Sequence, residues 1–263
     1  MRININKNNM LCSYSSDVGL EPIDMDKLNF KNQKEIKIDT GEEYHTLDVS
    51  MWLPFAAPHY RISPNIRDYI LVPVPSVVTE LPNTNGDAVT KAEMLRFIPE
   101  QGMLAYKTFV GKCCFREHDN QDITKAKGII LDAYIRVLKG FGRDKHYKLI
   151  KLLAFDRTKD AALCDEITSG RGNSYSMGLY FDSYSCSICN NRVGKTSGRA
   201  CIHTELKRPT YLTSGGRLAY RLMHDIIGFE CSAVLDPAFL CAISDHVMNP
   251  QQQFPNSRFT ATL

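Results

Sequence analysis

Gly170-Arg-Gly-Asn-Ser-Tyr-Ser-Met-Gly-Leu-Tyr-Phe181 is the most informative segment of the chain. It places Ser176 inside an apolar run that is typical of a strand, with Gly178 two residues later. A serine hydroxyl beside a residue without a side chain leaves room for a substrate carbonyl, which a serine nucleophile requires. A small residue at a tight packing site of a sheet would give the same pattern. The surrounding sequence must therefore distinguish a nucleophile from a packing residue.

Apolar runs on both sides of this segment predict a sheet core. The runs typical of strands are Tyr69–Pro75, Met103–Val110, Gly128–Leu138, Tyr147–Phe155 and Glu230–Leu235. Two polar, glycine-containing segments, Asn83–Asp87 and Lys139–Asp144, are predicted as turns. These runs indicate that much of the chain forms strands.

Three helices are expected beside the sheet. Residues Lys159–Gly170 have apolar side chains at helical spacing and end at a glycine, as a capped helix does. Residues Gly216–Gly228 and Ala238–His246 are predicted as the second and third helices. The expected fold class is therefore α+β, with a sheet core flanked by helices.

The ends of the chain are expected to lie outside this core. Residues 1–65 are polar and mixed around one apolar patch, Met51–Pro58, and are assigned to an N-terminal arm or small subdomain. Residues 66–248 are assigned to the main domain. Residues 249–263 are poor in apolar side chains and are predicted to form a flexible tail.

Composition disfavours several classes of function. The 263 residues carry 32 Lys and Arg and 29 Asp and Glu, and the net charge of +3 is too small to favour nucleic-acid binding. The sequence has neither the apolar run of a signal peptide nor that of a membrane span, so a cytosolic protein without a membrane partner is expected. In that compartment the nine cysteines are expected to be thiols or metal ligands instead of disulfides.

The histidine in Phe115-Arg-Glu-His-Asp119 is the candidate base for Ser176. A serine hydrolase needs a nucleophile, a base that takes its proton, and usually a third group that orients the base. Asp156 follows a predicted strand and is assigned this third role, because a carboxylate there could reach an imidazole on a neighbouring strand. Asp132 and Asp119 remain open as alternatives.

The order of these segments resembles that of the phage prohead proteases, the capsid-maturation enzymes of tailed phages. In that family a His-Asp pair precedes a Gly-led strand, and a helix ending in glycine precedes a Ser-Ile-Gly or Ser-Met-Gly strand. This chain has His118-Asp119, then Gly128, and later Ser176-Met-Gly178. Phe229–Ala238 is similar to the family's Glu-x-Ser-x-Val-x-x-Pro-Ala segment, and together the matches span roughly residues 100 to 245.

The resemblance implies the herpesvirus-assemblin type of fold, a β-barrel-like sheet flanked by helices. It implies a serine endopeptidase with His118 as general base and Ser176 as nucleophile. Its substrates would be phage scaffold and major capsid proteins, cleaved inside the prohead in the host cytoplasm, and a homo-oligomer is left open. An inactive, zinc-stapled structural or scaffold-binding component of the prohead is the alternative function.

A cluster of cysteines predicts a zinc site. Cys186-x-x-Cys189 is followed, after a polar loop, by Cys201-x-His203, and these ligand types and spacings suit tetrahedral zinc. Four protein ligands leave no position for water, so the zinc would be structural and would staple an insertion at residues 184–205. A metallohydrolase is disfavoured for the same reason, and no His-Glu-x-x-His motif is present. The other cysteines in apolar context, expected in the core, are Cys113, Cys114, Cys164, Cys231 and Cys241.

Overall fold

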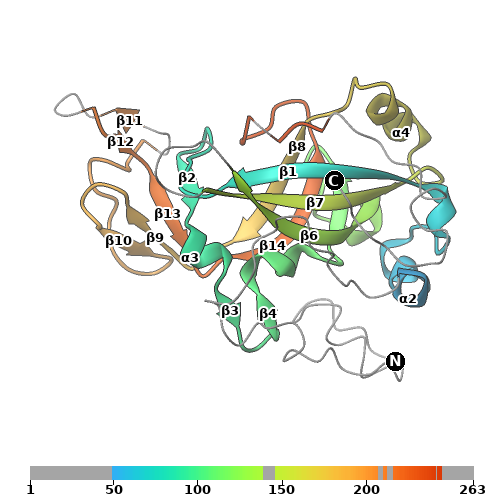
Figure 1. Ribbon diagram of the computed structural model, residues 1–263, viewed down its shortest axis with the longest axis horizontal. Helices are drawn as coiled ribbons and strands as arrows, with labels where there is room; N and C mark the ends of the chain where they lie inside the picture. The colour runs from blue at the N-terminus through green and yellow to red at the C-terminus, as the bar shows by residue number, and fades with distance from the viewer. Residues whose placement is uncertain (1–48, 139–145, 207–209, 212–215, 241, 245–263) are drawn as a thin grey trace.

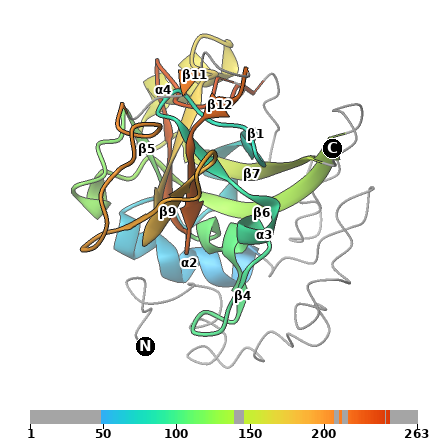
Figure 2. The same cartoon turned by 90° about the vertical axis from the view of Figure 1, so that its left-hand side faces the viewer.

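The computed structural model describes residues 49–138, 146–206, 210–211, 216–240 and 242–244 (Figure 1). In these residues the protein is mostly β, with few helices, and its largest sheet is curled into a half-barrel (Figure 2). The predicted turn at Lys139–Asp144, the tail at 249–263 and residues 1–48 of the arm lie outside the described residues.

The main sheet has six strands in the order β1-β7-β6-β5-β14-β8. Their bounds are Tyr69–Val78 for β1, Cys113–Arg116 for β5, Gly128–Leu138 for β6, His146–Asp156 for β7, Tyr175–Tyr180 for β8 and Ile227–Ala233 for β14. Neighbouring strands are antiparallel except β5 and β14, which are parallel. The edge strands β1 and β8 approach each other because the sheet is curled.

The central strands are buried on both faces, which explains why their sequences are continuous apolar runs. In β7, Leu153 and Phe155 pack into one hydrophobic cluster, while Leu152 and Ala154 pack into a second cluster on the other face. β6 begins at Gly128, where a Cβ atom would lie 1.9 Å from the carbonyl oxygen of Ala154. Only glycine allows β7 to approach so closely there.

Most of the smaller sheets extend the molecule at one end, and the β3–β4 pair projects elsewhere (Figure 1). A four-stranded sheet has the order β10-β9-β13-β2, with bounds Arg192–Gly194, Ser183–Cys186, Arg221–His224 and Asp87–Val89. Two strand pairs complete the β structure: β3 (Phe97–Ile98) with β4 (Met103–Leu104), and β11 (Thr210–Tyr211) with β12 (Leu218–Ala219). The predicted insertion at 184–205 thus shares a sheet with strands from two other parts of the chain.

The helices pack against the two hydrophobic clusters. α2 (Val49–Tyr60) places Leu53, Ala56 and Tyr60 in the second cluster, so this part of the predicted arm belongs to the core. α4 (Ala161–Thr168) contributes to the first cluster, and α3 spans Lys91–Met94. The 3-10 helices are η1 (Ile66–Asp68), η2 (Ala105–Phe109) and η3 (Ile123–Lys125). None of the helices in the described part of the chain has the length and apolar character needed to cross a membrane.

Several predicted elements are confirmed. The strands expected from Tyr69, Gly128, Tyr147 and Glu230 correspond to β1, β6, β7 and β14, and the helix expected within Lys159–Gly170 is α4. Asn83–Asp87 is a turn that leads into β2. Cys113, Cys114, Cys164 and Cys231 are buried as expected, while Cys241 lies outside the described residues.

Other predictions are wrong. Residues Gly216–Gly228 form β12, β13 and the start of β14, because pairing of β13 with both β9 and β2 outweighs the helical spacing of its apolar side chains. The described residues of Ala238–His246 contain no helix, and Ile243 instead forms a bridge with Ser174. Only the first two residues of the strand predicted at Met103–Val110 are extended, and η2 follows.

Candidate functional site

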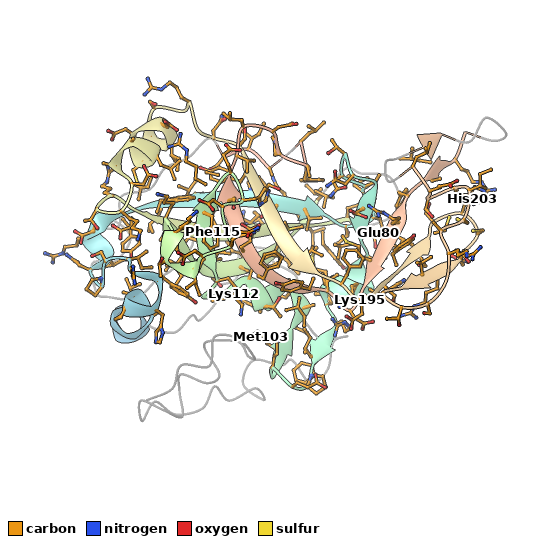
Figure 3. The ribbon with its side chains drawn as sticks, turned by 180° about the vertical axis from the view of Figure 1, so that it is seen from behind. Glu80, Met103, Lys112, Phe115, Lys195 and His203 are labelled. Carbon is orange, nitrogen blue, oxygen red and sulfur yellow. The ribbon has the colours of Figure 1, made fainter. Side chains whose placement is uncertain are left out.

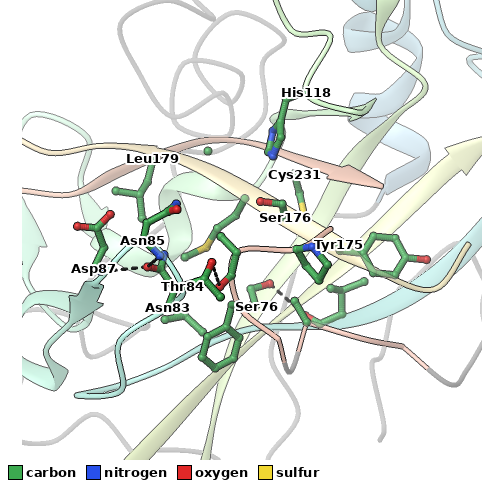
Figure 4. Close-up of a pocket in the computed structure, with 18 of the residues that line it drawn as sticks. Ser76, Asn83, Thr84, Asn85, Asp87, His118, Tyr175, Ser176, Leu179 and Cys231 are labelled. Carbon is green, nitrogen blue, oxygen red and sulfur yellow. Dashed lines mark hydrogen bonds between the residues drawn. The ribbon is translucent and has the colours of Figure 1, made fainter. Parts of the chain in front are cut away.

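A cavity of about 460 Å³ lies between the two edge strands of the main sheet (Figure 4). Five consecutive residues of β8, 175–179, line one side, and Val74, Ser76 and Val77 of β1 line the other. The turn carrying Thr84 and the segment carrying Ala238 form part of its wall, and the backbone N–H and the hydroxyl of Thr84 both donate to the carbonyl of Ala238, at 2.9 and 3.0 Å. His118 and Ser176, predicted from the sequence, both line this cavity.

Ser176 of β8 lies on the same face of the sheet as Glu230 and Ser232 of β14. Ser176 is opposite Ser232 and Gly178 is opposite Glu230 in the antiparallel pair. Side chains of directly opposed residues point to the same face of a sheet. Because Ser232 is fully buried and Ser176 is partly exposed, only Ser176 is accessible to a substrate.

His118 lies in a turn directly after β5. Both Glu117 and His118 adopt left-handed backbone conformations, with φ of 51° and 56°, which is uncommon for residues other than glycine. Hydrogen bonds hold this turn: the N–H of Glu117 donates to the carbonyl of Ala233 at 2.9 Å, and the N–H of Asn120 donates to the carbonyl of His118 at 2.7 Å. The turn is therefore attached to the end of β14, the strand that carries Glu230.

Glu230 is the carboxylate that contacts His118. Its Oε1 lies 3.0 Å from Nδ1 of His118, and its Oε2 accepts a hydrogen bond from Oγ of Ser232 at 2.5 Å. The Glu230 side chain is fully buried. The hydrogen bond that Glu230 accepts from Nδ1 raises the pKa of His118, and this effect exceeds the lowering caused by partial burial.

Gly178 has a different role from the one predicted. A Cβ atom at this position would lie 2.6 Å from Oε1 of Glu230 and 2.4 Å from Cζ of Phe229. The space that the absent side chain leaves is therefore occupied by Glu230 and Phe229, and is not open to a substrate carbonyl. Gly178 allows the Glu230 carboxylate to reach His118.

Asp156 does not orient His118, so this predicted role is corrected. Its Oδ1 accepts from the N–H and hydroxyl of Thr158 at 2.8 and 2.7 Å, and its Oδ2 accepts from the N–H of Ser63 at 2.6 Å. A fully buried carboxylate with these partners fixes the turn after β7 and ties it to the segment before β1. Neither oxygen contacts His118.

The two alternative carboxylates also have other partners. Asp132 is buried and pairs with Nζ of Lys107 at 2.8 Å. Asp119 is exposed and pairs with Nζ of Lys125 at 2.8 Å. The carboxylate that contacts His118 is Glu230, and the spacing Glu230-Cys-Ser232 is the sequence feature that could have indicated it. Alternate residues of a strand lie on one face, and a buried glutamate needs a polar partner on that face.

Ser176 and His118 are not hydrogen-bonded to each other in this structure. Nε2 of His118 has no hydrogen-bond partner among the described residues, whereas Nδ1 is bound to Glu230. Hydrogen bonds between a catalytic base and its nucleophile are often long in ligand-free enzymes and shorten when substrate binds. The arrangement has the parts for proton transfer, with Nε2 available as the acceptor.

A buried lysine that sequence reasoning missed also lines the cavity. Lys151 of β7 is fully buried, and its Nζ lies 4.4 Å from the centroid of the Phe109 ring. No nitrogen or oxygen atom among the described residues forms a hydrogen bond with this amine. The thiol of Cys231 is near it, and burial raises the pKa of that thiol, so it is a weak neutral acceptor.

The structure brings the predicted metal ligands together. The ligand atoms of Cys186, Cys189, Cys201 and His203 all lie within 4.8 Å of one another. Nδ1 of His203 lies 3.7 Å from Sγ of Cys186 and 3.8 Å from Sγ of Cys201. Such separations fit a tetrahedral ion with Zn–S bonds of about 2.3 Å. The cluster could therefore hold a metal ion such as zinc.

The metal cluster is at one end of the molecule, apart from the main sheet. Figure 3 shows His203 well separated from Phe115 of β5. The cluster is linked to the cavity through the four-stranded sheet, in which Cys186 is opposite Arg221, and Arg221 forms an ion pair of 2.7 Å with Asp87. Asp87 lines the cavity, so the cluster supports the part of the sheet that forms its wall.

Comparison with known proteins returned no relative. No protein-family model matches the chain, and searches of curated proteins and of solved structures gave no significant match.

Proposed function

We propose that the protein is a serine endopeptidase of the phage prohead-protease type. Ser176 is the nucleophile, His118 the general base and Glu230 the carboxylate that orients the base. The observation that carries the proposal is that His118, whose Nδ1 is bound to the buried Glu230, and the partly exposed Ser176 line the same cavity. The curled, mostly β sheet is compatible with the herpesvirus-assemblin type of fold that the resemblance implies.

The geometry supports an acyl-transfer mechanism. As Oγ of Ser176 attacks the scissile carbonyl, its proton passes to Nε2 of His118, and the carbonyl π electrons move to the oxygen. The imidazolium is stabilised by Glu230 at Nδ1 and then gives the proton to the leaving amine. The Ser176 ester remains, and water hydrolyses it by the same proton transfers in a second step.

Ser232 positions the carboxylate in this scheme. Its hydroxyl donates to Oε2 of Glu230, which leaves Oε1 directed at His118. A glutamate side chain has three rotatable bonds, so a second hydrogen bond restricts it more than the contact with histidine alone. Ser232 therefore acts through Glu230 and does not touch the substrate.

The proposed substrates are phage scaffold and major capsid proteins, cleaved inside the prohead in the host cytoplasm. An inactive structural or scaffold-binding component is the second candidate function. The observation that favours it is the missing hydrogen bond between Ser176 and His118, since an inactive protein needs no such contact. In either case we propose that zinc at the cysteine cluster is structural, because four ligands leave no position for a reacting water.

Co-expression with a candidate scaffold protein tests the proposal. The wild-type protein should cleave the scaffold, and Ser176→Ala should reduce cleavage by roughly a thousandfold or more, because the nucleophile is lost. Ser174→Ala is the matched control, because Ser174 is the residue directly before β8, and this variant should cleave the scaffold normally. A scaffold that stays intact with folded wild-type protein, but is bound by it, would favour the structural component.

A further inference from the structure

Among the described residues, no strand pairs with the outer edge of β8 at Met177. The carbonyl of Ser174 accepts from the N–H of Val234 on the β14 side at 3.0 Å, whereas the N–H of Tyr175 donates to Ala242 on the outer side at 2.9 Å. Backbone groups in an antiparallel ladder alternate in direction from one residue to the next. Met177 and Leu179 therefore direct their N–H and C=O groups away from β14, toward the cavity between the edge strands.

The opposite edge cannot satisfy these groups in the same way. β1 contains Pro73 and Pro75, and both are opposite residues of β7 in the antiparallel pair. A proline within a paired strand has its nitrogen on the side away from the partner strand, and it has no N–H to donate. β1 thus lacks N–H donors at these two positions on the side away from β7, which disfavours direct pairing with β8. The cavity lies between these two edge strands.

The chain itself shows that this edge of β8 accepts an extended segment. Residues 242–244 run antiparallel to residues 173–175, with a bridge between Ile243 and Ser174. The N–H of Ser244 also donates to the carbonyl of Asn173 at 3.0 Å. The described pairs of this added segment reach Tyr175, one residue before Ser176, and Ser176 and Met177 line the cavity.

We propose that an extended polypeptide adds to β8 at Met177 and Leu179, between β8 and β1, so that its backbone passes Ser176. This inference rests on the proposed function, since the added segment is the substrate. Backbone pairing gives affinity with little dependence on sequence, and alternate side chains of the segment enter a cavity whose walls include Val74, Val77 and Met223. Apolar side chains at these alternate positions are preferred.

A peptide-binding experiment with the Ser176→Ala protein tests the site without requiring cleavage. Immobilised protein is incubated with a random library of ten-residue peptides, and a retained peptide is identified by mass spectrometry and made with a fluorescein label. Each backbone nitrogen of this peptide is then methylated in turn, and the dissociation constant is measured by fluorescence anisotropy. Methylation should weaken binding by about tenfold or more at alternate residues and have little effect at the residues between them.

Variants of the protein give an independent test. Met177→Pro removes the outward N–H and should weaken binding about tenfold, while Met177→Leu, which keeps it, should bind normally. Proline is tolerated at an edge position whose N–H points outward, and thermal unfolding verifies the fold. If Met177→Pro does not fold, the series of methylated peptides still tests the strand site, because it uses the Ser176→Ala protein with Met177 in place.

The outcomes separate this inference from the proposed function. Alternating losses without cleavage by the wild-type protein would support the strand site and overturn the protease. Cleavage together with equal effects at all methylated positions would overturn the strand site and keep the protease. Failure to retain any peptide, or a protein dimer that peptides do not displace, would also overturn the strand site, because a second copy would then occupy the edge.

Discussion

The metal cluster and the Ser176 site differ in how far apart their residues lie in the sequence. The four predicted ligands fall between Cys186 and His203, and all of them come together in the structure. The Ser176 site joins His118, Ser176 and Glu230, which lie on a turn and two strands from distant parts of the chain. Ligand spacing within one loop is visible in a sequence, whereas a partner supplied by strand register is not.

The largest expected effect is on kcat, and it distinguishes Glu230 from Asp156 as the carboxylate that orients His118. Glu230→Gln should lower kcat by roughly a hundredfold to ten-thousandfold, because the amide no longer stabilises the imidazolium and can hold His118 in the wrong tautomer. Asp156→Asn should lower thermal stability but leave kcat of the folded protein nearly unchanged, since Asp156 contacts Thr158 and Ser63. Initial rates and melting curves for both variants check this; the opposite pattern would restore Asp156.

Removal of a metal ligand tests the other region. Cys189 is exposed, so Cys189→Ser removes a ligand with little loss of packing, and any large fall in melting temperature reports the metal. We expect a fall of several degrees, at about 2–4 °C per kcal/mol for a domain of 150–250 residues, together with loss of stoichiometric zinc. Lys195→Ala, in the same loop and exposed, is the control. A wild-type protein purified without chelator that contains no metal would contradict the zinc site.

The pH dependence of cleavage should report the contact between His118 and Glu230. The base is the neutral imidazole, so kcat/KM should rise with pH through the pKa of His118, which lies above its ordinary value of 6.5. Glu230→Gln removes the main cause of the increase, and its profile should move to lower pH. Asp119→Asn should leave the profile in place, because Asp119 pairs with Lys125. An unchanged midpoint in Glu230→Gln would show that another group titrates.

The same contact makes folding stability depend on pH. A pKa that is higher in the folded protein than in the unfolded chain means that the folded state holds the proton more tightly. The stabilisation is therefore fully present below the unfolded value near 6.5 and is lost as pH rises through the higher folded pKa. Because the imidazole is partly exposed, we expect this effect to be small.

The smallest expected effect concerns the lysine of the cavity wall. Lys151→Met keeps the aliphatic stem and the contact with Phe109 but removes a buried amine without a nitrogen or oxygen partner. This substitution should raise stability by about 1–3 kcal/mol, measured by denaturant unfolding. Lys148→Met, on the same strand, is the comparison and should have little effect. A destabilised Lys151→Met protein would show that the amine has a favourable role in the fold.

The sequence predicted those parts of the fold that depend on local pattern. Gly128–Leu138 was identified correctly because a strand buried on both faces is a continuous apolar run. Gly216–Gly228 was not, since its apolar spacing fits a helix and only pairing of β13 with β9 and β2 makes it extended. Glu230 was noted in a motif, but its contact with His118 depends on the register of β14 and on the left-handed turn at His118.

The most direct test of the Ser176–His118–Glu230 site is active-site labelling. A fluorophosphonate probe added to the wild-type protein should label Ser176 alone, as tryptic mass spectrometry would show, because only an activated serine attacks such a phosphorus centre. Labelling should be lost in His118→Ala, strongly slowed in Glu230→Gln and retained in Asp156→Asn. Labelling that is absent from folded wild-type protein, that falls on another serine, or that is unaffected in Glu230→Gln would contradict the account.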